Sequence, residues 1–79
     1  MVTADSVRLG IASGLACERI EVTGDGQHFQ ALIVSGAFRE QSRVQRHQLV
    51  YAALGERMRE EIHALSMRTL TPEEFAAGG

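Results

Sequence analysis

A glycine-rich turn, GDG at residues 24–26, separates two segments that have the side-chain patterns of β-strands. Residues 19–23 (RIEVT) alternate apolar and polar side chains, which is the period-two pattern of a half-buried strand. Residues 28–35 (HFQALIVS) contain a continuous apolar run, which indicates a strand covered on at least part of both faces. Because glycine adopts the positive φ angles of tight turns at little cost, we predict a β-hairpin.

A helix is predicted before the hairpin. Thr3 can cap its start, and Val7, Ile11 and Leu15 follow at intervals of four residues, which places them on one helix face. Two glycines in this segment lower its helix propensity by up to about 1 kcal/mol each relative to alanine. Packing against the rest of the chain must therefore hold this helix.

The main helix is predicted over residues 43–60. Ser42 and Gln45 form the Ser-x-x-Gln capping box that marks a helix start. At 100° per residue, six side chains fall inside an arc of about 120°, with the histidine near its middle. We expect this arc to face the core; it contains Val44, His47, Val50, Tyr51, Leu54 and Met58.

Residues 62–69 (IHALSMRT) are predicted to form a third strand, and a short helix should follow it. Thr71 is a helix cap, Pro72 occupies the first helical position, and Glu74 completes a second capping box. We expect this last helix to bring Phe75 back toward the domain.

The predicted order is α-β-β-α-β-α. A strand–helix–strand crossover sets the third strand parallel to the second if the two are neighbours. We therefore predict an α+β fold, a two-layer sandwich with helices on one face of a three-stranded mixed sheet. Residues 1–79 should form one domain, with a core over about 4–76 and a frayed tail at 77–79.

Composition limits the classes of function. With 44% hydrophobic and 23% charged residues, the 79-residue chain is ordinary for a globular protein, and its net charge of −2 gives no overall attraction to nucleic acid or anionic membranes. The single cysteine, Cys17, excludes an internal disulfide and fits a reducing compartment. No apolar stretch is long enough to span a membrane. The expected location is cytoplasmic.

Two histidines are candidate metal ligands. His63, at the start of the third strand, can offer one ring nitrogen outward, or it can simply end an apolar face and hydrogen-bond locally. His28 would approach it if the two strands begin at the same end of the sheet. Two histidines are only part of a metal site, so any metal would have to be shared with another molecule. Asp25 is a poorer candidate ligand beside sulfur-rich iron.

The remaining chemically notable side chains have structural interpretations. His47 is expected to be largely buried and neutral, with a hydrogen-bond partner, and Cys17 to pack as a small apolar residue. Arg39, Arg43 and Arg46 cluster at the start of the main helix and could meet phosphates, or could form a solvated face balanced by glutamates. No catalytic Ser/His/Asp or Cys/His set is evident, so we expect no enzymatic activity.

Three segments, HFQALIVSGAF, RVQRHQLVYAALGE and IHALSMRTLTPEEF, resemble successive signature blocks of the BolA family over roughly residues 4–76. The resemblance implies a fold like the type II KH domain. The chain lacks the Gly-x-x-Gly loop with which KH domains clamp RNA, so RNA binding does not transfer. The resemblance further implies a monothiol glutaredoxin as partner and a shared [2Fe–2S] cluster. In such pairs the histidine matching His63 is a ligand, and the partner contributes a cysteine and glutathione.

The second BolA-side ligand is usually a cysteine or histidine in the loop between the first two strands. Here that loop, GDGQ, contains neither, and His28 at its end is the nearest substitute. By this analogy the isolated chain binds no cofactor, and it is a monomer alone or a heterodimer with glutaredoxin.

Other BolA-like proteins resemble DNA-binding transcriptional regulators of stress response and cell shape. Their helix–turn–helix-like region matches residues 38–54 of this chain, where Arg39, Arg43 and Arg46 would be the candidate contacts. The acidic balance of the chain makes this the second hypothesis.

Overall fold

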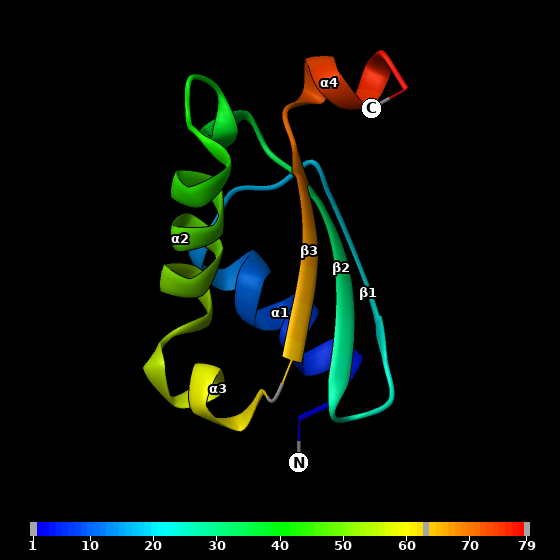
Figure 1. Ribbon diagram of the computed structural model, residues 1–79, viewed down its shortest axis with the longest axis vertical. Coiled ribbons are helices and arrows are strands. Elements are labelled where there is room, and N and C mark those ends of the chain that lie inside the picture. Colours follow the sequence, from blue (N-terminus) through cyan, green and yellow to red (C-terminus); the bar gives the residue numbers. More distant parts are fainter. Residues whose placement is uncertain (1, 63, 79) are drawn as a thin grey trace.

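The computed structural model describes residues 2–62 and 64–78, without the side chains of residues 57–59. The side chain of Met58, a predicted core residue, and the whole of His63, the predicted ligand, therefore lie outside what the structure describes. In chain order the elements are α1 (Ala4–Gly14), β1 (Arg19–Gly24), β2 (His28–Val34), the 3-10 turn η1 (Gly36–Phe38), α2 (Arg43–Leu54), α3 (Glu56–Glu61), β3 (Ala64–Leu70) and α4 (Pro72–Ala76) (Figure 1).

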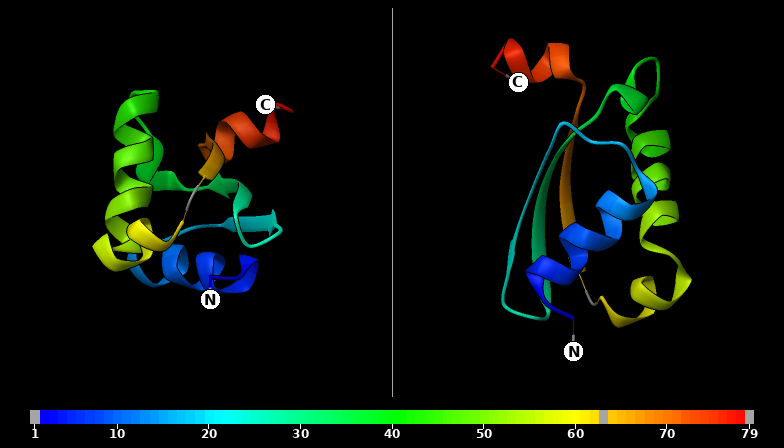
Figure 2. Two further views of the ribbon diagram at one scale, coloured as in Figure 1. Left: turned by 60° about the horizontal axis from the view of Figure 1, so that its bottom comes forward. Right: turned by 180° about the vertical axis from the view of Figure 1, so that it is seen from behind.

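The sheet has the order β1-β2-β3, with β1 antiparallel and β3 parallel to β2. Both the hairpin and the parallel crossover predicted from the sequence are confirmed. Helices α1 and α2 cover one face of this sheet, and α4 continues beyond the end of β3 (Figures 1 and 2). The fold is therefore the predicted two-layer α+β sandwich. Among the described residues, no helix is both long and apolar enough to cross a membrane.

The core lies between the sheet and the two covering helices. Alternate residues of β2, Phe29, Ala31 and Ile33, are buried, as the period-two geometry of a strand requires when one face is covered. From α1, Val7 and Ile11 are fully buried against them, which confirms the predicted apolar face of this helix.

The first helix begins where the sequence predicts. The Thr3 hydroxyl accepts a hydrogen bond from the Ser6 N–H at 3.1 Å, and the Ser6 side chain accepts one from the Thr3 N–H at 2.8 Å. This reciprocal pair satisfies two backbone donors that a helix start would otherwise leave unbonded. Val2, just before the cap, is buried and belongs to the core.

The main helix is shorter than predicted. The predicted span 43–60 is wrong, because α2 ends at Leu54 and Gly55 has a φ of +84°. The Gly55 N–H donates to the Tyr51 carbonyl at 3.1 Å, and the chain then turns into the separate helix α3. Glycine at this position terminates the helix because it tolerates a left-handed backbone that side chains disfavour.

Val44 is not a core residue, although the sequence predicts one. It is 65% exposed, whereas Val50 and Leu54 of the same helix are buried. Helix α2 meets α1 near its C-terminal half, and its first turns extend past the end of α1 (Figure 1). The helical period is therefore as expected, but only part of the helix has a neighbour to pack against.

Two predictions near the C-terminus also need correction. The third strand covers Ala64–Leu70 rather than residues 62–69, with Ile62 partly buried ahead of it. Phe75 does not return to the core: it is 38% exposed, and the Arg19 guanidinium lies 5.3 Å from its ring centroid. Helix α4 lies beyond the end of the sheet, so it cannot reach the layer between the sheet and α1.

Helices α1 and α2 approach each other closely at Gly14. A Cβ atom at this position would lie 2.7 Å from the Cα of Ala53 and 3.0 Å from its carbonyl oxygen. Because these are backbone atoms, they cannot move aside without shifting α2. The absence of a side chain at Gly14 therefore sets the distance between the two covering helices.

We predict that Gly14→Ala destabilises the protein by about 1–3 kcal/mol, the usual cost of overpacking. The clash should outweigh the gain of up to about 1 kcal/mol in helix propensity that alanine brings. Urea unfolding measures the difference. Ser13→Ala, on the exposed side of the same helix, is the control and should change the stability by less than about 0.5 kcal/mol. A Gly14→Ala protein as stable as wild type would show that the helices can separate freely.

Candidate functional site

The turn between β1 and β2 is fixed by Asp25. Its Oδ1 accepts hydrogen bonds from the N–H groups of Gln27 and His28, each at 2.9 Å, and its own N–H donates to the His28 carbonyl at 3.2 Å. The N–H of His28, followed by that of Gln27, holds the pKa of the Asp25 carboxyl below its usual value. This carboxylate thus acts as a turn-forming group, in accord with its low rank as a metal ligand.

His28 is exposed and lies at the end of the sheet where β3 also begins. Its Cα is the register partner of Ala64, and the Ala64 N–H donates to the carbonyl of neighbouring Gln27 at 3.1 Å. The expectation that both strands start at the same end is confirmed (Figure 1). His63, the residue before Ala64 in the sequence, lies outside the described residues. Within the described ranges, no three His, Cys, Asp or Glu side chains are grouped as a metal site.

His47 is less buried than predicted. The residue is half-buried and lines an open groove of about 700 Å³ between α2 and β3. It lies in the first turns of α2, which extend past α1 and so lack the cover that the sequence pattern suggested. Cys17 packs against the core, as predicted, and is half-buried. Its thiol donates to the Leu15 carbonyl at 3.3 Å, and burial raises its pKa above the usual value. A thiol with a raised pKa is a poor nucleophile at neutral pH.

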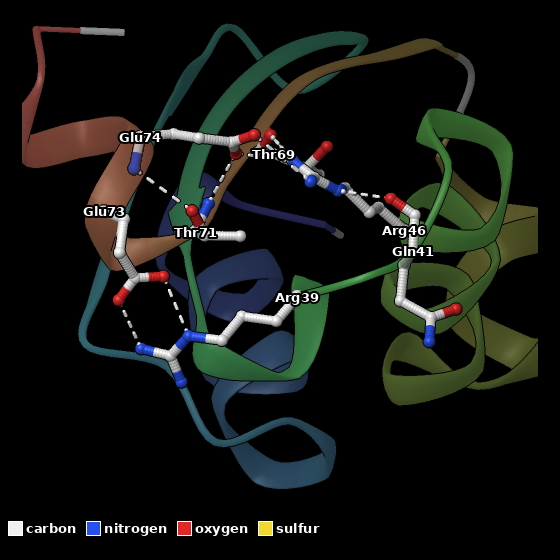
Figure 3. A network of polar contacts seen from close by, with 7 residues as sticks. All are labelled: Arg39, Gln41, Arg46, Thr69, Thr71, Glu73 and Glu74. Carbon is white, nitrogen blue, oxygen red and sulfur yellow. Dashed lines mark hydrogen bonds and ion pairs between the residues drawn. The ribbon is translucent and has the colours of Figure 1, made fainter.

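The three candidate arginines have different surroundings. Arg39 makes a bidentate pair with Glu73, with Nε–Oε1 and Nη2–Oε2 distances of 2.8 and 2.6 Å (Figure 3). Arg43 is exposed and has no interaction partner among the described residues. The guanidinium of Arg46 is the most enclosed, with only 14% of the side chain exposed.

Arg46 connects three parts of the chain. Its Nε donates to the Gln41 carbonyl at 3.0 Å, and its Nη1 donates both to the Thr69 carbonyl at 3.0 Å and to Glu74 Oε1 at 2.7 Å (Figure 3). Its guanidinium also lies 5.9 Å from the ring centroid of buried Phe38. Arg46 therefore links the start of α2, the end of β3 and helix α4 in one network.

Glu74 serves the same network in two ways. Its Oε1 accepts from the Thr71 N–H at 2.8 Å, while the Thr71 hydroxyl accepts from the Glu74 N–H at 3.1 Å, which confirms the predicted capping box. The Arg46 guanidinium, together with the Thr71 N–H, lowers the pKa of the Glu74 carboxyl to about 2. The sequence pattern identified the cap but not the arginine, which lies 28 residues away along the chain.

We predict that the Glu74 carboxylate makes the free energy of unfolding depend on pH in the acid range. Since the pKa of Glu74 is lowered on folding, its contribution is complete above the unfolded value of about 4.3 and is lost as the pH falls through about 2. Glu74→Gln keeps an oxygen for the Thr71 N–H but removes the charge. Wild type should therefore be more stable than Glu74→Gln at pH 6, and the difference in urea midpoint should shrink by pH 2.

The control for this measurement is Glu60→Gln, which neutralises an exposed carboxylate. Its difference from wild type should change little between the two pH values. If the difference in urea midpoint between wild type and Glu74→Gln stays constant down to pH 2, the Arg46–Glu74 pair does not contribute to stability in solution.

Comparison with known proteins agrees with this architecture. The family described as BolA-like protein matches residues 6–74. Acid stress protein IbaG of Escherichia coli is 39% identical over 67 residues, which cover 84% of this chain and 80% of that protein. The DNA-binding transcriptional regulator BolA of Haemophilus influenzae is 44% identical over 54 residues, covering 68% of this chain and about half (52%) of that protein.

A solved structure shows the same fold. The bolA protein homologue from Coxiella burnetii superposes with a TM-score of 0.85 at 43% identity, covering 96% of this chain and 99% of that chain. The fold and the polar network thus define a small α+β domain whose last helix is tied to the start of its main helix. The chain belongs to the BolA-like protein family.

Proposed function

We propose that this chain is a non-enzymatic partner of a monothiol glutaredoxin, and that the pair shares a [2Fe–2S] cluster in iron–sulfur trafficking or iron and redox sensing. His63 is the proposed ligand from this chain, and His28 the proposed second one. The observation that carries the proposal is the parallel register of β2 and β3, in which His28 faces Ala64, the residue directly after His63.

The described surroundings of His28 fit such a role. The histidine is exposed, and its backbone is anchored by Asp25 and by the ladder to β3, so an imidazole nitrogen could be presented without unfolding the turn. A [2Fe–2S] cluster takes four protein or thiol ligands. Because the described residues hold no group of three suitable side chains, the remaining ligands would come from the partner's cysteine and glutathione.

Histidine ligation gives a physical reason why this chain would take part in the complex with glutaredoxin. A neutral imidazole in place of a thiolate removes negative charge from the cluster, and in Rieske-type centres such ligation accompanies a higher reduction potential. The residues of this chain would therefore change the potential and the lability of the cluster. That change would suit transfer or sensing.

We predict that the mixed complex has its own visible circular dichroism, distinct from that of glutaredoxin alone. His63→Ala should return the spectrum to that of glutaredoxin with its cluster, and His28→Ala should shorten the cluster's lifetime in the presence of a chelator by severalfold. His47→Ala, the third histidine, lies in the α2–β3 groove and serves as the matched control with a wild-type spectrum. Identical spectra for wild type and His63→Ala would exclude the ligand role.

DNA binding is the second candidate function. The name of the Haemophilus influenzae relative favours it, as do two exposed arginines, Arg43 and Arg68, that have no partner among the described residues. The pairing of Arg39 with Glu73 and of Arg46 with Glu74 weighs against it, since paired guanidinium groups have less charge to offer phosphates.

We predict the salt dependence that DNA binding would show. With two phosphate contacts, log K should fall by about 1.8 for each tenfold rise in salt, and Arg43→Gln should reduce that slope by about 0.9. Fluorescence anisotropy with a labelled duplex at several salt concentrations measures it. Arg8→Gln, whose arginine pairs with Asp5 on α1, is the control. Salt-independent or undetectable binding would exclude this function.

A further inference from the structure

The outer edge of β3 carries backbone groups that the sheet does not use. Strand β3 is at the edge of the sheet, with β2 as its neighbour on one side. The N–H of Ala64 donates to Gln27, and the carbonyl of Leu70 accepts from Ser35, so both groups face β2. Because backbone groups alternate sides along a strand, those of the odd-numbered residues face away from β2. These residues are Leu65, Met67 and Thr69.

The carbonyl of Thr69 independently confirms this direction. It accepts from the Arg46 guanidinium on α2, on the side opposite β2. Within the described part of the chain it is the one outward group of β3 that has a hydrogen-bond partner. No described residue bonds to the N–H or carbonyl of Met67, so both can pair with an added strand.

The open groove runs along this edge. Met67, Arg68, Thr69 and Leu70 line it on the β3 side. Its other lining residues are Gln41, Arg43, Arg46 and His47, around the start of α2, and Glu74 of α4. Its volume is about 700 Å³.

The charge around this edge is positive. Arg43 and Arg68 are exposed without a partner among the described residues, whereas the single carboxylate of the groove, Glu74, is bound by Arg46. In the register of the sheet Arg68 lies beside Leu32, on the face opposite the helices. A strand added to β3 would therefore meet one free arginine on each of its two faces.

We infer that the outer edge of β3 is a docking site for an extended, acidic segment of a partner protein, which joins the sheet as a fourth strand. Its backbone pairs with Met67, and its acidic side chains alternate between Arg68 on the open face and Arg43 in the groove. Main-chain pairing supplies the affinity in this mode of recognition, and side chains supply the selectivity.

Two other occupants fit less well. A second copy of this chain, paired edge to edge, would bring the free arginines of both copies together, and like charges across strands are unfavourable. A nucleic acid would match the arginines, but its phosphate backbone has no N–H groups for the Met67 carbonyl.

This site is separate from the proposed cluster ligands. From Ala64 to Thr69 a strand rises by about 16 Å, so the groove lies toward the opposite end of β3 from His28. The inference does not depend on the cluster hypothesis, and the two can fail independently.

The test uses the full chain and a synthetic probe, the labelled peptide Thr-Val-Glu-Glu-Glu-Val-Thr with blocked ends, whose consecutive glutamates point to both faces of an extended strand. We expect binding that slows amide hydrogen exchange of Met67 in NMR spectra. Arg43→Glu and Arg68→Glu should each weaken binding by about three- to tenfold, while Arg8→Glu, an equal change of charge on α1, should weaken it less than twofold. A lysine version of the peptide should not bind.

A second probe separates strand pairing from plain charge attraction. The same peptide with every backbone nitrogen methylated keeps its charge but has no backbone N–H to donate, and it should bind at least tenfold more weakly. Equal binding of both peptides, unchanged exchange at Met67, or no binding at millimolar concentration would each overturn the inference. So would a DNA duplex that binds the same arginines more tightly than the peptide. Unaltered peptide binding by the His28→Ala, His63→Ala double variant would support the separation of the two sites.

Discussion

The parallel pairing of β2 with β3 is the constraint on which the rest of the structure depends. Parallel strands begin at the same end of a sheet, so this pairing brings the hairpin turn next to the start of β3 although some 35 residues separate His28 from Ala64. It also requires a crossover, and α2 supplies the helix that covers the sheet on the way. Without this one ladder the turn and the last strand would share no common edge.

A second, smaller interaction secures the far end of the same strand. Arg46 holds the Thr69 carbonyl and Glu74 together, so that the end of β3 and the short helix α4 are attached to α2 rather than to the core. Phe75 is outside the core for the same reason: α4 is positioned by ion pairs beyond the sheet. The domain thus has an apolar centre and a polar attachment for its last helix.

The sequence predicted what depends on local patterns. Residues near each other in the chain were enough to predict the cap at Thr3, the capping boxes at Ser42 and Thr71, the period-two alternation around Val22 and the order of the elements. The failures arose where a neighbour distant in sequence decides. Val44 fits the helical period of the apolar stripe, but no helix lies opposite it. The sequence does not distinguish Arg46 from the other surface arginines, because its partner Glu74 is distant in the chain. The break at Gly55 had a visible signal, a glycine after Leu54, which the apolar periodicity obscured.

The hairpin turn itself has a consequence for how such domains diversify. Asp25 keeps the turn closed through backbone contacts, and Gly26, with a φ of +102°, has open space where a side chain would project. Extra residues inserted there would extend into solvent at small entropic cost and leave the buried layer unchanged. The side chains at this corner of the domain can then change through one loop, while the core stays the same.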